Sequence, residues 1–349
     1  MTSIESRKQD HIDIVLQKDV RAKGVTTGFE RFFFEHVALP ECHLDEVDLR
    51  VRMWGRELRA PFLISSMTGG TSEAARINLH LAEAAQALGI AMGVGSQRAA
   101  LEDDALAATY RVRHVAPDIL LLANFGAVQL NEGYGVDEAR RAVEMIEADA
   151  LILHLNPLQE AVQPGGDRDW RGLYAKIETL ARQLDVPIVV KEVGNGISAR
   201  VAMRLVECGV AAIDVAGAGG TSWSEVEAYR QQDPLRRHIA HTFAGWGIPT
   251  ALALMEVRAA VPPEVLVFAS GGIRSGVDAA KAIRLGATLV GSAAPLLQPA
   301  TDHTQAVFDT FQAYIEELRI AAFCVGATSL DDLRRAPLRR TDTWEYVAV

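Results

Sequence analysis

The sequence predicts an α/β protein built as one (β/α)8 barrel, the TIM-barrel architecture. Short runs of Val, Ile and Leu recur along the 349 residues, and each run is apolar throughout, as expected of strands that are covered on both faces. Segments with helical periodicity separate these runs, so the strands are expected to be parallel. Eight strand–helix units are the number that closes a barrel. A doubly wound open sheet is the alternative, although such a sheet usually has fewer strands.

The eight apolar runs follow one another at roughly the spacing of one strand–helix unit. We expect strands over 62–66, 90–94, 119–123, 150–154, 187–191, 211–215, 265–269 and 287–291. Between them, apolar residues at helical spacing predict helices over 73–88, 137–147, 173–184, 199–208 and 277–285.

Three regions lie outside the repeat within the single domain expected over 1–349. An N-terminal extension (1–60) precedes the barrel core (61–300), and a helix over 302–324 with a basic remainder forms the C-terminal part (301–349). An insertion, 222–248, follows the sixth strand. Long loops at this end of a barrel often cover active sites, so the insertion is either a lid or an ordered surface segment. The basic tail is expected to be pinned at an interface or mobile.

Composition excludes several classes of protein. Lys and Arg number 35 against 45 Asp and Glu, a net charge of -10, whereas a nucleic-acid binder usually shows the opposite balance. No apolar run reaches the roughly 18 to 20 residues that span a bilayer, and the first residues lack the apolar centre of a signal peptide. The three cysteines are scattered and form no disulfide framework. We therefore expect a cytoplasmic protein with neither membrane nor nucleic acid as partner.

Every predicted strand ends in polar or glycine-rich residues. The carboxyl ends of barrel strands meet at one mouth, where the active sites of such barrels lie. These strand ends therefore predict one functional site. In chain order they are 66–70, 95–98, Asn124, 154–160, Lys191 with Glu192, 217–221, 270–274 and 292–294.

The last two strand ends predict a phosphate site. Gly271 and Gly272 allow backbone amides to approach an anion closely, Arg274 lies beside them, and the helices that follow add the positive ends of their dipoles. Two tight turns that need positive φ angles are the alternative. Gly217 to Gly220 is not a dinucleotide-binding fingerprint, because it lacks the required context.

Several other side chains suit anionic ligands. Lys191 ends an apolar strand, where burial of its charge needs an anionic or electron-rich partner; a salt bridge to Glu192 is the alternative, although adjacent strand residues face opposite sides. Glu160 could bind Mg²⁺ or cap a helix. Arg7, Lys8 and Arg98 suit a second anionic group. The inventory fits two phosphorylated ligands, a cofactor and a substrate. Asn124 and His154, also at strand ends, are either catalytic or structural.

The motifs resemble those of the type 2 isopentenyl diphosphate isomerases. The resemblance extends from residue 7 to about 297 and is carried by Arg7-Lys8 with Asp10-His11, by SMTGG (66–70), GSQR (95–98), HLNPLQE (154–160) and KEVG (191–194), and by SGGIR (270–274). It implies an FMN- and Mg²⁺-dependent isomerase that interconverts isopentenyl and dimethylallyl diphosphate without net redox change. NADPH would reduce the flavin, and the family commonly forms tetramers or octamers.

The resemblance also implies roles for particular residues. Reduced FMN would itself supply and accept the protons, and Lys191 would stabilise its anionic form. Gln159, Lys191 and His154 are the catalytic candidates, Glu160 the Mg²⁺ ligand, and His11 a further substrate contact. The substrate-binding candidates are Arg7, Lys8, Ser96, Gln97, Arg98 and Gln159. The FMN-binding candidates are Ser66, Met67, Thr68, Ser96, Asn124, Lys191, Thr221, Gly271, Gly272, Ile273, Ala293 and Ala294.

Two other functions compete with this one. An FMN-dependent 2-hydroxy acid oxidase on the same barrel would need a base such as histidine after the seventh strand, where this chain has Ser270-Gly271-Gly272-Ile273-Arg274. A non-catalytic protein that binds a phosphorylated ligand is the second alternative, but it would have no use for Lys191 and Gln159 together.

Overall fold

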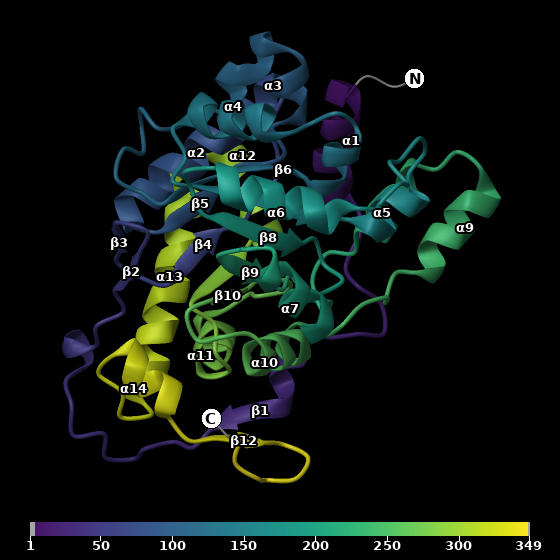
Figure 1. The fold of residues 1–349 in the computed structure, drawn as a ribbon. Helices are drawn as coiled ribbons and strands as arrows, with labels where there is room; N and C mark the ends of the chain where they lie inside the picture. Colours follow the sequence, from purple (N-terminus) through teal and green to yellow (C-terminus); the bar gives the residue numbers. More distant parts are fainter. Residues whose placement is uncertain (1–3, 348–349) are drawn as a thin grey trace.

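The computed structural model describes residues 4–347 and contains a closed barrel of parallel strands surrounded by helices (Figure 1). Around the barrel the order is β10-β11-β4-β5-β6-β7-β8-β9, so strands that follow one another in sequence are neighbours in space. This confirms the predicted (β/α)8 barrel and excludes the open sheet.

Each barrel strand coincides with one of the eight predicted runs, and only the ends differ. The strand ends lie where pairing with the neighbours stops; β6, for example, extends to Gly126 because its residues 122–126 pair with residues 150–154 of β7. The strands are β4 (Phe62–Ile64), β5 (Ala91–Gly93), β6 (Leu121–Gly126), β7 (Ala150–Leu155), β8 (Ile188–Glu192), β9 (Ala212–Asp214), β10 (Leu266–Ala269) and β11 (Leu289–Ser292).

The five helices predicted between the strands are present, and each end lies within one residue of the expected position. Local capping explains this agreement: the Thr71 hydroxyl accepts a hydrogen bond from the Ala74 amide (3.0 Å), and Gly89 ends the same helix at φ 67°. These helices are α2 (Ser72–Leu88), α4 (Val136–Ile146), α6 (Leu173–Gln183), α7 (Ala199–Glu207) and α11 (Gly276–Arg284).

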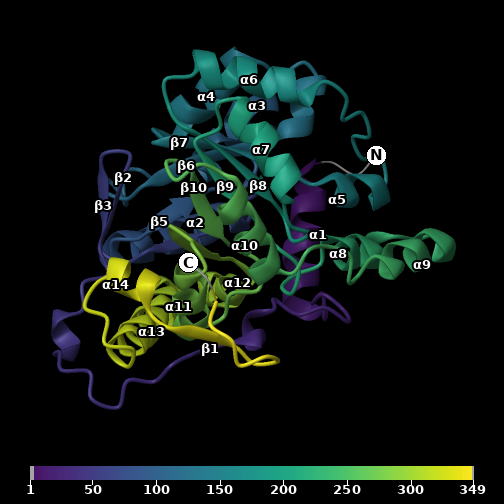
Figure 2. The same ribbon diagram turned by 60° about the horizontal axis from the view of Figure 1, so that its bottom comes forward.

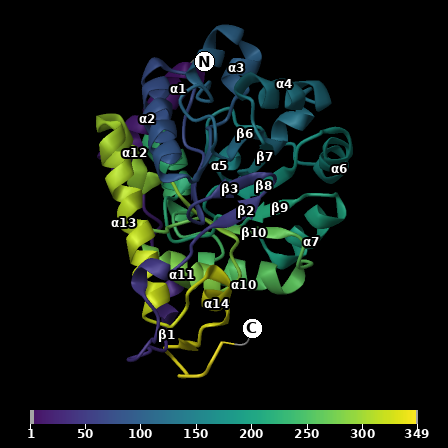
Figure 3. The same cartoon turned by 90° about the vertical axis from the view of Figure 1, so that its left-hand side faces the viewer.

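Further helices complete the outer layer. In Figure 3, α2, α12 and α13 line one side of the barrel, and α6 and α7 line the other. The predicted C-terminal helix is α13 (Thr304–Phe323). The others are α3 (Arg98–Glu102), α5 (Pro157–Val162), α10 (Thr250–Ala260), α12 (Ala294–Asp302) and α14 (Leu330–Arg335), with short 3-10 turns at Phe29–Arg31, Leu44–Glu46, Asp104–Thr109 and Ala127–Asn131.

The N-terminal extension contributes an element to each end of the barrel. Its first helix, α1 (Ile4–Gln17), lies at the C-terminal mouth, where Ile12 is buried. The hairpin of β2 (Val51–Met53) and β3 (Arg56–Leu58) covers the opposite end, where the Trp54 ring packs against Phe268, with 6.3 Å between ring centroids. The mouth with α1 is therefore the end that is left for a ligand.

The basic tail fits only one of the two expectations for it. Its strand β12 (Leu338–Arg340) pairs antiparallel with β1 (Phe32–Phe34) of the N-terminal extension, and Leu338 is fully buried. This pairing contradicts the alternative of a mobile tail, which considered only the surface charge of the tail, and it is compatible with the alternative of an interface. The tail instead packs on the chain's own N-terminal segment, because Leu338 and Ala336 supply apolar surface for burial.

The insertion forms a helical hairpin that extends away from the barrel beside α1 (Figure 2). It consists of α8 (Trp223–Arg230) and α9 (Pro234–Thr242), and α8 contacts α1 and α5. The insertion is therefore helical, and its Trp223 forms part of the wall of the mouth. In the described part of the chain, no helix is both long and apolar enough to cross a membrane.

Candidate functional site

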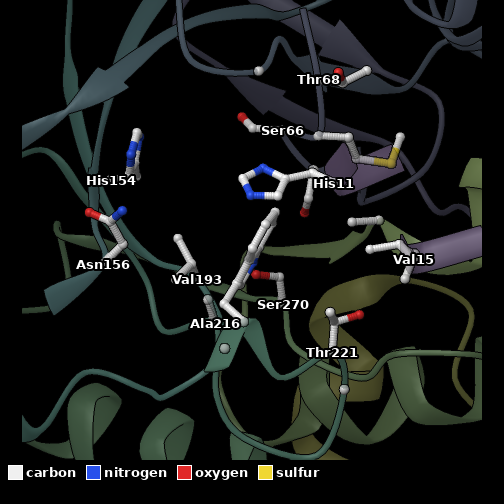
Figure 4. A pocket seen from close by; sticks show the side chains of 18 of the residues that line it. His11, Val15, Ser66, Thr68, His154, Asn156, Val193, Ala216, Thr221 and Ser270 are labelled. Carbon is white, nitrogen blue, oxygen red and sulfur yellow. The ribbon is translucent and has the colours of Figure 1, made fainter. Parts of the chain in front are cut away.

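One pocket of about 270 Å³ at the C-terminal mouth collects residues from the ends of all eight barrel strands. Two segments outside the barrel add to its wall, α1 with Arg7, Lys8 and His11, and the insertion with Trp223. Figure 4 shows the side chains of His11, His154 and Ser270 around the same hollow. The strand ends therefore meet as the sequence predicted.

All but one of the predicted site residues line this pocket. Gln97 is the exception. The pocket-lining set is Arg7, Lys8, His11, Ser66, Met67, Thr68, Ser96, Arg98, Asn124, His154, Gln159, Glu160, Lys191, Thr221, Gly271, Gly272, Ile273, Ala293 and Ala294.

Gln97 is fully buried behind the pocket rather than in it. Its Oε1 accepts a hydrogen bond from the backbone amide of Asn124 (2.9 Å), and its Nε2 donates to the carbonyl oxygen of Ala142 (2.8 Å). Both ends of the side-chain amide are thus used within the protein. Its placement does not support the predicted substrate contact and indicates support of the neighbouring strand.

Lys191 has an anionic partner, and that partner is Asp214 rather than Glu192. The Lys191 Nζ lies 3.2 Å from Oδ2 of Asp214 and donates to the Ser270 hydroxyl (3.1 Å). The Glu192 carboxylate accepts hydrogen bonds from the backbone amides of Val193 and Gly194, each at 2.7 Å. Sequence reasoning missed Asp214, although a carboxylate in the otherwise apolar run 211–215 was the available signal.

Asn124 and His154 form a pair at the ends of β6 and β7. The Nδ1 atom of His154 lies 2.8 Å from the Asn124 Oδ1, so the neutral imidazole donates to the amide oxygen. Burial, together with the charges of Lys191 and Lys8, lowers the pKa of His154 to about 4. His154 is therefore neutral at pH 7 and is a hydrogen-bonding group rather than a cation.

A buried carboxylate joins α1, α5 and the insertion. Glu227 on α8 has a fully buried side chain and accepts a hydrogen bond from Gln159 Nε2 (3.1 Å), pairs with His11 (2.9 Å) and pairs with Arg230 (2.7 Å). Burial by itself would raise the pKa of Glu227, but the hydrogen bond and charge of His11 and the charge of Arg230 outweigh it, so the pKa is lowered. Sequence reasoning missed Glu227, because nothing in the local sequence distinguishes it from other helix carboxylates.

Lys8 is held above the pocket by the loop after β5. Its Nζ donates to the carbonyl oxygen of Ser96 (2.9 Å) and contacts the Tyr110 hydroxyl, which itself donates to the same carbonyl (2.7 Å). Burial, and then the nearby charge of Arg7, lowers the pKa of Lys8 to about 7, although Glu102 acts in the opposite direction. A bound anion would reverse this shift.

Arg98 and Glu160 are linked through Asp167, which contacts both residues. Arg98 pairs with Asp167 (2.9 Å), whose backbone amide donates to Oε2 of Glu160 (2.8 Å). Asn156 donates to the other Glu160 oxygen (2.9 Å). Burial raises the pKa of Glu160, while these two hydrogen bonds oppose the rise. No cluster of three or more His, Cys, Asp or Glu residues within 4–347 could hold a metal.

The turn of Gly271 and Gly272, which the sequence predicts to bind phosphate and which we call the phosphate turn, has the positive φ angles that glycine favours. Gly271 and Gly272 adopt φ angles of 101° and 77°, which other residues rarely adopt. A Cβ on Gly220 would lie 2.5 Å from the Gly272 amide nitrogen, so the loops after β9 and β10 pack backbone against backbone. Ala293 and Ala294, at the start of α12, line the pocket beside this turn, at the positive end of the helix dipole.

Two buried hydroxyls in the same pocket are available to a ligand. The Oγ atoms of Ser65 and Ser66 have no hydrogen-bond partner among the described residues. Buried hydroxyls are rarely left unpaired. Together with the phosphate turn and Lys191, they fit a polar, phosphorylated ring compound such as FMN.

The comparisons with known proteins agree with this geometry. The family model of the FMN-dependent dehydrogenases matches residues 2–115 and 156–340. A solved structure of a mandelate oxidase variant with (S)-mandelic acid superposes with a TM-score of 0.65 at 21% identity, covering 95% of this chain and 94% of that chain, which shows the fold.

Much closer in sequence are curated isopentenyl-diphosphate delta-isomerases. The protein of that name from Synechocystis sp. is 65% identical over 338 residues, 97% of each chain. The one from Stutzerimonas stutzeri is 64% identical over 339 residues, 96% of this chain and 97% of that one. This chain therefore belongs to the FMN-dependent, type 2 isopentenyl-diphosphate delta-isomerase family.

Proposed function

We propose that this chain, as one domain, interconverts isopentenyl and dimethylallyl diphosphate with FMN in the barrel mouth and Mg²⁺ beside the diphosphate. One observation carries the proposal: a single pocket brings together two separate sets of residues that suit anions. The first is the phosphate turn of Gly271 and Gly272, and the second is the cationic group of Arg7, Lys8 and Arg98. Two sets suit a phosphorylated cofactor and a phosphorylated substrate.

The first set would hold FMN, with the turn and the start of α12 at the phosphate and Lys191 at the ring. When bound and reduced, FMN would supply the acid–base chemistry of the reaction, with NADPH as the reductant. The chain's own residues bind and orient it; the other proposed contacts are Ser66, Met67, Thr68, Ser96, Asn124, Thr221, Ile273, Ala293 and Ala294.

The second set would hold the substrate diphosphate. Lys8 has a lowered pKa because it is buried, and a diphosphate beside it would favour the protonated form. Arg98 would add a guanidinium that can bind two phosphate oxygens, while Ser96 and Gln159 would complete the contacts. Gln97 is left out of this proposal because its side chain is used behind the pocket.

Glu160 would hold Mg²⁺ together with the substrate. Mg²⁺ in phosphate-binding sites usually takes one or two carboxylates and completes its coordination with phosphate oxygens and water. Glu160 is buried at the pocket wall, and Asn156 holds its carboxylate. A bound divalent cation would favour the ionised carboxylate, which burial by itself disfavours.

The remaining polar side chains suit a reaction whose transition state carries positive charge on the substrate. Protonation of an unactivated alkene needs a positioned acid and a site that excludes water. His154 is neutral and cannot deliver a proton as a cation at pH 7, so we assign it to substrate contact. We also assign His11 and Gln159, which line the same pocket, to substrate contact. Lys191 would stabilise negative charge on the cofactor ring.

The decisive experiment measures isopentenyl diphosphate conversion under nitrogen with FMN, Mg²⁺ and NADPH, with each component omitted in turn. We expect dimethylallyl diphosphate only when all three are present. Product without reductant would overturn the flavin assignment. A yellow, FMN-loaded protein that forms no product but oxidises a 2-hydroxy acid would favour the oxidase, and a protein that binds no flavin would argue against both enzymes.

The metal assignment has its own test. Glu160→Gln removes the charge of the side chain and leaves one oxygen to accept hydrogen bonds instead of two, so we expect the Mg²⁺ concentration for half-maximal activity to rise about tenfold or more. Glu178→Gln is the matched control, because Glu178 forms an exposed pair with Arg182 far from the pocket. An unchanged Mg²⁺ requirement in Glu160→Gln would place the metal elsewhere.

We also propose that the protein is a cytoplasmic homo-oligomer, a tetramer or an octamer, as the family resemblance implies. Light scattering coupled to size-exclusion chromatography measures the mass directly. A monomer at micromolar concentration would overturn this part of the proposal and leave the catalytic assignment untouched.

A further inference from the structure

Asp214 is a buried carboxylate beneath the mouth that the reaction itself does not explain. It is the last residue of β9, and it is 1% exposed. It does not line the pocket, whereas its partners Lys191, Ser270 and Ala216 do. Asp214 can therefore act on a ligand only through these neighbours.

The two oxygens of Asp214 have different partners. Oδ1 accepts hydrogen bonds from the backbone amides of Ser270 (3.2 Å) and Ala216 (3.3 Å), and from the Ser270 hydroxyl (2.8 Å). Oδ2 faces the Lys191 ammonium at 3.2 Å and lies 3.0 Å from the Ser270 hydroxyl. One side of the carboxylate thus holds the loop backbone, and the other holds a cation.

Ser270 links both sides. Its hydroxyl donates to Asp214 and accepts from Lys191 Nζ (3.1 Å), which fixes the direction of its single proton. Ser270 is also the residue that precedes Gly271 and Gly272. Asp214 therefore anchors the start of the phosphate turn and the ammonium of Lys191 at the same time.

Among the described residues, Asp214 is the only carboxylate that forms a close ion pair with the Lys191 ammonium. On the β7 side, its register partner His154 is neutral at pH 7, because its pKa is lowered to about 4. On its own strand, the Glu192 carboxylate is occupied by the backbone amides of the following loop, and only the Glu192 carbonyl oxygen contacts Lys191 (3.0 Å). A buried ammonium without a close counter-ion is strongly destabilising, so the position of the Lys191 ammonium depends on Asp214.

We propose that Asp214 is a positioning residue, which aims the Lys191 ammonium at the cofactor ring and holds the phosphate turn through Ser270. This inference rests on the proposed function only where it names FMN as the ligand. The ion pair and the turn anchor belong to the chain itself and can be tested without flavin.

Asp214→Asn separates the two roles. Its amide oxygen can keep the contacts of Oδ1 with the loop backbone, but its amide nitrogen places a donor against the Lys191 ammonium. Asp149→Asn is the matched control: Asp149 is a carboxylate paired with Arg113 (2.9 Å) and Arg56 (2.8 Å) at the opposite end of the barrel. It reports the general loss of stability from removing a charged pair.

The first measurement uses cyanate on the flavin-free protein at pH 8, with peptide mass spectrometry to follow Lys191. Cyanate carbamoylates neutral, accessible amines, so a paired ammonium reacts slowly. We expect Lys191 in Asp214→Asn to react about fivefold faster or more than in wild type, since the contact that holds the amine in place is lost. Asp149→Asn should react as wild type does. Equal rates in wild type and Asp214→Asn would overturn the proposal.

The second measurement is FMN binding, followed by flavin fluorescence and by the absorption spectrum of the bound oxidised flavin. Asp214→Asn should raise the dissociation constant about tenfold or more and shift the spectrum, whereas Asp149→Asn should change neither. Tight, spectrally unchanged binding in Asp214→Asn would overturn the proposal while leaving the proposed function intact. Failure of the wild type to bind FMN would instead overturn the proposed function, and the cyanate result would still stand.

A double variant keeps the proposal testable in case the single variant does not fold. If Asp214→Asn does not fold because Lys191 is left unpaired, then removing that charge as well, in Lys191→Met with Asp214→Asn, should restore a cooperative unfolding transition. A double variant as unstable as the single one would show that the Lys191 pair is not what Asp214 supports, and would overturn the proposal.

Discussion

The Nε2 atom of His11 lies 2.9 Å from Oε1 of Glu227, although 216 positions separate the two residues in the sequence. The first residue belongs to α1 and the second to α8, so this contact joins the N-terminal extension to the insertion across the mouth of the barrel. The Trp223 ring lies edge-on to the same imidazole, with 5.1 Å between ring centroids. Two segments outside the barrel repeat thus form one wall of the pocket.

Glu227→Gln should loosen that wall. The variant removes the buried negative charge and turns an amide nitrogen toward one of its present donors, so we expect the free energy of unfolding to fall by about 2–4 kcal/mol. Urea denaturation followed by tryptophan fluorescence measures this loss, and limited proteolysis should cut within α1 more readily. Glu178→Gln, which changes an exposed pair, should lower stability by less than about 1 kcal/mol. If the two variants were equally stable, the wall would not depend on Glu227.

His154 should lower the stability of the protein in mild acid. Its pKa is about 4 in the folded protein, below the ordinary value of 6.5. Between these values the unfolded chain binds a proton that the folded chain does not, so the free energy of unfolding should decrease as the pH falls from 6.5 to about 4. His154→Gln can still donate to Asn124 but does not titrate, and its stability should depend less on pH over this window. Parallel pH profiles for the two proteins would contradict the assignment.

Binding of a diphosphate should be coupled to proton uptake by Lys8. At pH 8 the Lys8 amine is mostly neutral, because its pKa is about 7, and a bound anion would protonate it. Calorimetric titration with isopentenyl diphosphate in two buffers of different ionisation enthalpy should show that wild type takes up about one proton more than Lys8→Met. Lys23→Met, which changes an exposed lysine paired with Asp19, is the control and should match wild type. Equal uptake in Lys8→Met and wild type would place the diphosphate away from Lys8.

Gln97 should support folding and not substrate binding. Gln97→Leu leaves the Asn124 amide and the Ala142 carbonyl without their partner, so we expect a loss of about 2–4 kcal/mol in the free energy of unfolding. The KM of the folded enzyme for isopentenyl diphosphate should stay within about twofold of wild type, since Gln97 lies behind the pocket. Gln305→Leu removes an exposed hydrogen bond with Asp309 and serves as the control for the change in side chain. A large rise in KM without loss of stability would indicate that Gln97 contacts the substrate.

The fold was predictable because its signals are local and repeated. Each barrel strand is a continuous apolar run, and caps such as Thr71 and Gly89 mark the ends of the helix between them. The tail was not predictable in the same way. The basic residues around Leu338 gave no indication that this side chain is buried. In addition, the pairing of β12 with β1 joins segments about 300 residues apart.

The residues that line the pocket could be predicted from the sequence, but the hydrogen bonds and ion pairs among them could not. Gln97 and Ser96 are adjacent, yet only Ser96 lines the pocket, because the loop turns one side chain inward and the other toward Ala142. Asp214 and Glu227 were missed for a related reason. Neither lines the pocket, and each acts through a partner from another strand or helix.

The sequence by itself determined the barrel and which residues reach its mouth, since parallel strands that close into a ring bring all their carboxyl ends to one rim. Only the tertiary structure decided which charges are paired there. Lys191 meets Asp214 across two strands, and His11 meets Glu227 across two segments outside the repeat. The attraction between opposite charges is strong only where packing brings them within about 4 Å, and that proximity arises only when the chain has closed.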